Sequence, residues 1–152
     1  MTFRGDDRAA SATVSHAVTI GITALLLTGL FISAGDLFER QQQQTGREQL
    51  EAVGGKLAGQ IQRVDSLGDA GRDVRATLRT SYPSSVAGEP YTVHLVPADG
   101  NATLYVNSTQ LDVRRSFVVV NETRVEPARV TGGTIRVALR SDGTGEYLTL
   151  TN

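Results

Sequence analysis

The stretch AASATVSHAVTIGITALLLTGLFISAG, residues 9–35, contains no Asp, Glu, Lys or Arg. As an α-helix it would measure about 40 Å at a rise of ~1.5 Å per residue, which exceeds the ~30 Å hydrocarbon core of a bilayer. The stretch is therefore long enough to cross a membrane. The interpretation of every other segment depends on whether the mature protein keeps it.

The composition of the chain limits what the remaining residues can do. Beyond the apolar stretch, a sequence of 152 residues has room for one small folded domain. Its net charge of -1 predicts no electrostatic attraction to nucleic acid. Because the sequence contains no cysteine, disulfides and thiolate metal sites are excluded.

Two interpretations of the apolar stretch follow from general rules for targeting segments. In a secretory signal, Arg4 and Arg8 would be the basic start, residues 18–32 the apolar core, and Ser33-Ala34-Gly35 the cleavage site. Cleavage there would release a β domain that begins at Asp36. Without any cleavage, the stretch would remain as a simple membrane anchor that carries an extracellular binding module.

A third interpretation rests on Asp7-Arg8-Ala9-Ala10-Ser11, where charged residues meet small ones directly before the apolar run. This junction resembles the leader of type IV pilin-like proteins, especially archaeal ones. The resemblance implies that a prepilin peptidase cuts between Ala9 and Ala10, so that residues 1–9 are a leader. Residues 10–35 then form a transmembrane and polymerisation helix on the mature protein. Bacterial pilins usually carry Glu at the fifth mature position, which here is Val14, and archaeal relatives generally lack this acid.

Small residues recur one helical turn apart within the apolar stretch, in Ala17-xxx-Gly21 and Gly29-xxx-Ser33. Such spacing lets two helix backbones approach closely inside a membrane, so these four residues are the predicted helix-packing positions. Arg4 and Arg8 before the stretch balance Arg40 and Arg47 after it, so the flanking charge leaves the orientation open.

Residues 36–82 are predicted to continue the helix as an exposed amphipathic region, because the first proline of the sequence is Pro83. Apolar residues recur at spacings of three and four and define one face: Leu50, Val53, Leu57, Ile61, Val64 and Leu67. Gly54, Gly55 and Gly59 predict a kink or a close contact with another element. Charged residues at helical spacing predict a short solvated helix from Asp69 through Thr77 to Arg79.

The pattern changes to β in residues 88–152, which are predicted to form a small antiparallel head of four to six strands packed on the apolar helix face. Alternation predicts three sets of inward side chains: Tyr91, Val93 and Leu95; Ala102, Leu104 and Val106; Ile135, Val137 and Leu139. The run Phe117–Val120 is apolar on both faces and predicts a central strand. Gly132-Gly133 predicts a hairpin turn, and 141–145 predicts another that leads to the inward Leu148 and Leu150. The fold class is therefore α+β.

Three N-glycosylation acceptor motifs occur within the predicted head, at Asn101, Asn107 and Asn121. If they are used, the head lies outside the cell and the leader lies inside. A catalytic site is not evident, because His16 and His94 are far apart, so no His-based triad or metal cluster is visible, and no phosphate-binding glycine loop occurs. Asp99-x-Asn101 lacks the later acidic ligands of a calcium loop and is predicted to be a turn.

The sequence therefore favours a structural subunit, major or minor, of an archaeal type IV pilus-like surface filament rather than an enzyme. The expected partners are the membrane, other pilin subunits and the prepilin peptidase. No cofactor, metal, nucleic acid or small-molecule substrate is expected. The subunit would lie in the cell membrane before assembly and in the cell-surface filament, with a role in adhesion, afterwards.

Overall fold

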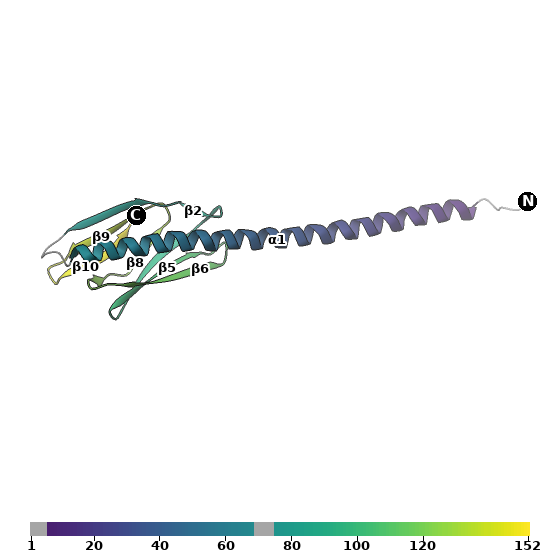
Figure 1. Ribbon diagram of the computed structural model, residues 1–152. Coiled ribbons are helices and arrows are strands. Elements are labelled where there is room, and N and C mark those ends of the chain that lie inside the picture. The colour runs from purple at the N-terminus through teal and green to yellow at the C-terminus, as the bar shows by residue number, and fades with distance from the viewer. Residues whose placement is uncertain (1–5, 69–74) are drawn as a thin grey trace, which may run out of the picture. The chain divides into compact units, whose positions relative to one another are not determined.

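A computed structural model describes the backbone of residues 6–68 and 75–152, and the side chains of residues 14–68 and 75–152. Within these ranges the chain consists of the helix α1 (Asp6–Gly68) followed by ten short strands (Figure 1). The predicted α+β class is confirmed. The chain divides into two compact units, Met1–Gln41 and Gln42–Asn152, and α1 contributes residues to both. The second unit is called the head below.

The strands of the head form two four-stranded sheets and one two-stranded ribbon. Sheet 1 has the order β1-β9-β10-β7, and sheet 2 has the order β6-β5-β4-β8. Sheet 1 contains β1 (Ala76–Ser81), β9 (Thr134–Ser141), β10 (Glu146–Thr151) and β7 (Arg124–Val125). Sheet 2 contains β6 (Val113–Val120), β5 (Asn101–Ser108), β4 (Thr92–Ala98) and β8 (Ala128–Thr131), and the ribbon pairs β2 (Ser85–Val86) with β3 (Glu89–Pro90).

The head part of α1 buries one apolar face, as its spacing of three and four predicts. Leu50, Leu57 and Ile61 are fully buried, and Val53 and Val64 are nearly so. These side chains share one core with the inward residues of both sheets, among them Val93, Leu104, Ile135 and Leu148. Leu67, however, remains 48% exposed. The prediction was wrong there because Leu67 lies in the last turn of α1, beside a hollow that Ala76 and Leu78 of β1 also line.

The predicted alternation of inward and outward side chains is confirmed for three strands and for the last hairpin. Val93 and Leu95 of β4, Ala102, Leu104 and Val106 of β5, and Ile135, Val137 and Leu139 of β9 are buried, as is Tyr91 directly before β4. Strands β9 and β10 pair antiparallel through the 141–145 turn, and Leu148 and Leu150 point into the core. Nearly all strand pairs are antiparallel, as predicted, although β10 and β7 pair in parallel.

The prediction that Phe117–Val120 lies in a central strand was wrong. Strand β6 lies at an edge of sheet 2 and pairs only with β5 among the described strands. Val118 and Val120 are 67% and 65% exposed, whereas Val119 is buried and Phe117 is partly buried. The inward side chains of this run pack on the core. Its outward side chains form an exposed apolar surface, so both faces are apolar although the strand is at an edge.

Two further local predictions were wrong. Thr77 and Arg79 belong to β1, which pairs antiparallel with β9, so the predicted solvated helix does not extend over them; Asp69 and the residues up to 74 lie outside the described residues. This segment forms a strand because pairing with β9 supplies backbone hydrogen bonds. These hydrogen bonds outweigh the ion pairs that charges at helical spacing would form in a helix. Gly132-Gly133 joins β8 to β9, which belong to different sheets, and is therefore a connection between sheets instead of a hairpin turn.

Candidate functional site: the apolar helix and the head surface

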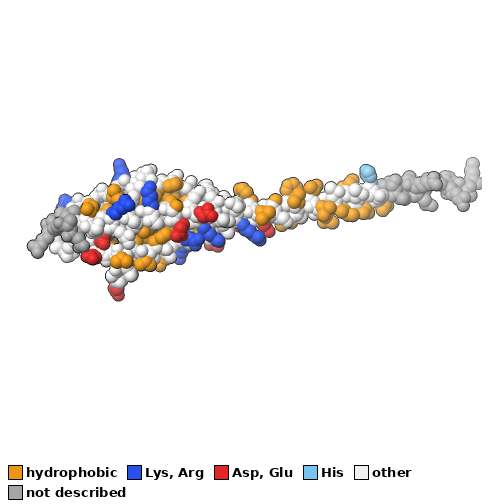
Figure 2. Space-filling view, in the orientation of Figure 1, with side chains coloured by type: hydrophobic (Ala, Val, Ile, Leu, Met, Phe, Trp, Pro, Cys, Tyr) orange, Lys and Arg blue, Asp and Glu red, His pale blue; other side chains and the backbone are white. Residues whose placement is uncertain are grey.

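The apolar part of α1 exposes large hydrophobic side chains in every direction. Between residues 14 and 38, twelve large hydrophobic side chains are at least 48% exposed: Val14, Val18, Ile20, Ile22, Leu25, Leu26, Leu27, Leu30, Phe31, Ile32, Leu37 and Phe38. Figure 2 shows this hydrophobic surface along the helix. A helix that is apolar on all sides is normally buried in an apolar environment. By length and composition, this one can cross a membrane or serve as a signal sequence.

Four hydroxyl side chains of the same segment are satisfied within the helix. The hydroxyl groups of Thr19, Thr23, Thr28 and Ser33 each donate a hydrogen bond of 2.8–2.9 Å to the carbonyl oxygen four residues earlier. Because these donors do not need water, they do not oppose transfer of the helix into lipid or into a bundle of helices.

The four predicted helix-packing residues are all exposed. Gly21 and Gly29 have open space where a Cβ would stand, and Ala17 and Ser33 are also exposed. The Ser33 hydroxyl donates to the Gly29 carbonyl, which places these two small residues on one face. Their role in helix packing stays a prediction. Arg8, Ala9 and Ala10 lie within the bounds of α1, but their side chains lie outside the described residues.

A close backbone contact joins α1 to β6 at Gly54. A Cβ on this glycine would overlap the Phe117 ring, with ring atom Cζ only 2.6 Å away. From the sequence, Gly54, Gly55 and Gly59 predicted either a kink or a close contact with another element. Gly54 allows the close contact, whereas Gly55 and Gly59 face open space. Beside it, Glu51 and Arg115 form a surface ion pair at 3.1 Å.

Polar residues of α1 also hold the head strands, and the sequence did not predict these contacts. The Tyr82 hydroxyl donates to Gln60 Oε1 at 2.6 Å, and Gln60 Nε2 donates to the Thr80 hydroxyl at 2.7 Å. Burial, and secondarily the nearby Tyr91, raises the pKa of Tyr82 to about 12. Gln60 lies next to the buried Ile61. A polar residue at the border of the apolar stripe was therefore the sequence signal that could have indicated this contact.

Asp65 is the second such residue. Its carboxylate accepts hydrogen bonds from the backbone N–H groups of Glu122 and Thr123, both at 3.0 Å. Only 9% of Asp65 is exposed, so these two bonds compensate for the burial of its charge. The contact fixes the segment between β6 and β7, which carries the acceptor motif of Asn121.

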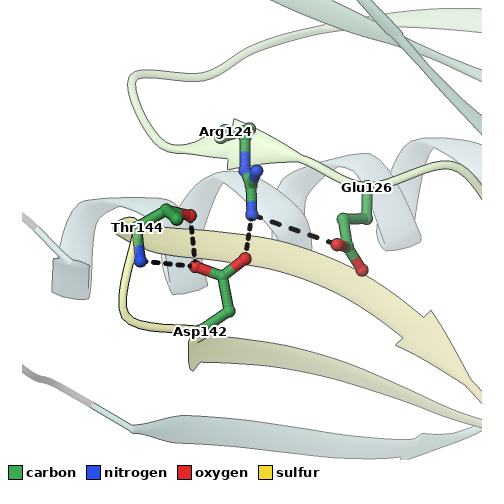
Figure 3. Close-up of polar contacts among 4 residues, drawn as sticks. All are labelled: Arg124, Glu126, Asp142 and Thr144. Atoms are coloured by element: carbon green, nitrogen blue, oxygen red, sulfur yellow. Dashed lines mark hydrogen bonds and ion pairs between the residues drawn. The ribbon is translucent and has the colours of Figure 1, made fainter.

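On the other side of that segment, Arg124 connects β7 to the β9–β10 hairpin (Figure 3). Arg124 donates to the Asp142 carboxylate, lies 4.0 Å from a Glu126 oxygen, and stacks over the Tyr147 ring. Asp142 also accepts from the hydroxyl and the backbone N–H of Thr144. These Thr144 bonds, and then Arg124, lower the pKa of Asp142 to about 2. The cluster lies on the surface and closes the hairpin.

The three acceptor asparagines lie in two different settings. Asn101 and Asn107 lie on β5, both on its outward face, since the residues that alternate with them are buried. Asn107 Oδ1 accepts a hydrogen bond from the Thr92 hydroxyl at 3.0 Å. Asn121 instead follows β6, where its Nδ2 donates to the Thr123 carbonyl at 2.7 Å and its Oδ1 is buried.

His94 also lies on the outward face of sheet 2, paired with Tyr105 of β5 and Arg129 of β8. Partial burial, together with the charges of Arg129 and Arg114, lowers the pKa of His94 below its ordinary value. The imidazole is therefore neutral at pH 7. Among the residues that the structure describes, no group of three His, Asp or Glu side chains is arranged to hold a metal ion. Asp99 and Gly100 form the predicted turn.

No curated protein and no solved structure matches the chain. One family model does match, over residues 5–151, and this range contains the apolar helix and all of the head except Asn152. The chain is thus a member of the family described as "Family of unknown function (DUF7266)".

Proposed function

We propose that the protein is a structural subunit, major or minor, of an archaeal type IV pilus-like surface filament. In this proposal the helix waits in the membrane after export, and a prepilin peptidase removes residues 1–9. The helix then packs against helices of other subunits, with the head outside the cell. The function is assembly, and adhesion by the assembled surface, without catalysis.

The observation that carries the proposal is that the head does not use the apolar helix segment for its own core. The core of the head takes its helix residues from Leu50 onward, whereas residues 14–38 are exposed. Burying one large aliphatic or aromatic side chain stabilises by ~1.5–3 kcal/mol, so the twelve exposed ones correspond to on the order of 20 kcal/mol. So large an apolar surface must be shielded from water. Lipid shields it before assembly, and the helices of neighbouring subunits shield it afterwards.

The small residues of the segment support packing against protein as the final state. In lipid no hydrophobic force brings helices together, so association depends on close backbone contact. Gly21 and Gly29 have open space around them, and a neighbouring helix can approach closely there. The satisfied hydroxyl groups of Thr19, Thr23 and Thr28 suit both environments equally well.

The independence of the head core also supports a second candidate, a monomeric membrane-anchored binding module. Such a protein would need the same apolar helix and the same self-contained head, but it would keep its leader and would not polymerise. Cleavage after Gly35 would likewise spare the core, because the first helix residue of the hydrophobic core is Leu50. A secreted head domain would result.

The test is to shear cells that make the protein and to collect the released filaments. We expect the full helix-bearing chain in the filament fraction, and in cells without the prepilin peptidase we expect it only in the membrane with its leader uncut. A chain that stays in the membrane as a monomer in both strains would support the anchored module. A chain free in the medium, outside any filament, would support secretion.

A further inference from the structure

Strand β5 carries two of the three acceptor asparagines on one outward face of sheet 2. Asn101, Thr103, Tyr105 and Asn107 alternate with the buried Ala102, Leu104, Val106 and Ser108. The two asparagines are six residues apart, which corresponds to about 20 Å along a strand at ~3.4 Å per residue. Two attached sugars would therefore stand side by side on the same surface.

Exposed valines surround the first of these acceptors. Cross-strand partners share a face of a sheet, and Asn101 is paired with Val120 of β6, while Thr103 of the same motif is paired with Val118 and Val96. Val96, Val118 and Val120 are 43%, 67% and 65% exposed. These three residues are called the valine patch. A sugar attached at Asn101 would start at the edge of this patch and can cover it with its C–H groups.

The side-chain amide of the second acceptor is oriented for modification. Asn107 Oδ1 is held by the Thr92 hydroxyl, and attachment of a sugar to Nδ2 leaves this bond intact. Two surface hollows of about 250 and about 210 Å³ border Asn107, one beside Tyr91 and Thr131 and the other beside Asp112 and Arg114. The surface next to Asn107 thus has room for the first sugar.

The third acceptor is closed in the folded head. Asn121 Nδ2, the atom that would receive the sugar, donates to the Thr123 carbonyl within its own motif. Its Oδ1 is buried and makes no hydrogen bond among residues 14–68 and 75–152, whose side chains the structure describes. Asp65 also holds the backbone N–H groups of Glu122 and Thr123, so the motif cannot open without breaking the contact with α1.

We propose that the outward face of sheet 2 is the glycan-bearing face of the head. Asn101 and Asn107 carry N-linked sugars, the sugar on Asn101 covers the valine patch, and Asn121 stays unmodified. The inference rests on the proposed function in one respect, that the head lies outside the cell.

The modification is a transfer from a sugar linked to a lipid phosphate. Asn Nδ2 forms a bond to the anomeric carbon, and the bond from that carbon to the phosphate oxygen breaks. The lipid phosphate leaves with the electron pair, and one Nδ2 proton passes to a base of the transferase.

The test is site mapping by mass spectrometry on the protein purified from the cells that make it. Cleavage after arginine gives residues 80–114, with Asn101 and Asn107, and residues 116–124, with Asn121. We expect sugar on both asparagines of the first peptide and none on the second. Sugar on Asn121, or a bare Asn101 or Asn107, would overturn the assignment. N101Q and N107Q should each remove one sugar and leave the other.

The same digest separates this inference from the proposed function. A chain that starts at Ala10 but has a bare Asn101 would overturn the glycan-bearing face and leave the filament subunit intact. A chain that keeps its leader and carries both sugars would overturn the filament subunit and leave the glycan-bearing face intact.

Cover of the valine patch is tested by hydroxyl-radical footprinting of the full chain. We expect N101Q to raise oxidation of Val118 and Val120 severalfold, because the sugar no longer shields them, and we expect N107Q to leave it unchanged. Equal oxidation in the wild type and N101Q would contradict the cover.

Discussion

The Asp65 carboxylate accepts the backbone N–H of Thr123 through Oδ1 at 3.0 Å, although 58 residues separate the two in the chain. Its other oxygen accepts the N–H of Glu122 at the same distance. A single residue near the end of α1 thus satisfies two backbone donors of the segment that connects sheet 2 to sheet 1. The helix contributes to the head as a hydrogen-bonding partner and also as apolar surface.

Asp65→Asn should destabilise the head by about 1–3 kcal/mol, because the amide offers one acceptor oxygen for two buried donors. The measurement is urea unfolding of the chain in mild detergent, followed by tyrosine fluorescence. All four tyrosines lie in the head, so the signal reports on that unit alone. Asp99→Asn, at the exposed turn between β4 and β5, is the matched control and should leave the midpoint in place. Equal midpoints for both variants would refute a structural role for Asp65.

Gly54→Ala and Gly55→Ala should change stability in opposite directions. Alanine normally stabilises a helix by up to ~1 kcal/mol relative to glycine, and Gly55 has room for it. At Gly54 the added Cβ overlaps the Phe117 ring, so overpacking by about 1–3 kcal/mol outweighs the gain in helix propensity. Unfolding midpoints of the two variants test this. The packing interpretation is wrong if Gly54→Ala is as stable as Gly55→Ala.

The head should lose stability in alkali as the pH rises above about 10. Burial raises the pKa of Tyr82 and that of Tyr91 to about 12, from an ordinary value of 10.0. Between these values the unfolded chain releases phenolic protons that the folded chain keeps, so unfolding becomes easier as the pH increases. Unfolding titrations between pH of about 9 and about 11 should show this decline, and Tyr82→Phe should make it less steep. A decline of the same slope in wild type and variant would exclude Tyr82 as a cause.

The helix and the strand faces could be predicted because local periodicity determines them. Leu50, Leu57 and Ile61 repeat at helical spacing, and Ala102, Leu104 and Val106 repeat at strand spacing, so each set shows its buried face directly. Edge and centre positions could not be predicted. Phe117–Val120 has the composition of a central strand, but its pairing depends on which other strands reach it, and that is a property of the whole topology.

The polar contacts of the head were beyond sequence analysis for a related reason. Nothing in the sequence next to Asp65 points to Thr123, since the contact depends on how the helix lies across both sheets. Similarly, the acceptor motifs of Asn107 and Asn121 are equivalent as sequence. Only the structure separates an outward amide on β5 from one that is hydrogen-bonded within its own motif.

Gly21→Leu should prevent assembly while insertion into the membrane and head stability stay unchanged. The larger side chain keeps two helix backbones apart at a position where they would otherwise meet. Thr19→Leu, which places a leucine on the opposite face of the same exposed helix, is the control and should assemble. The filament yield after shearing is the measurement. Loss of filaments in both variants, or in neither, would contradict a specific role for the Ala17 and Gly21 face.

The central claim is that the mature protein loses its leader and keeps the apolar helix. As a control for the site, replacement of Arg8 and Ala9 should block processing, and unchanged processing would exclude cleavage between Ala9 and Ala10. The most direct measurement is the amino terminus of the protein purified from cells. We predict Ala10 as the first residue, whereas an intact Met1 or a start at Asp36 would contradict loss of the leader with retention of the helix.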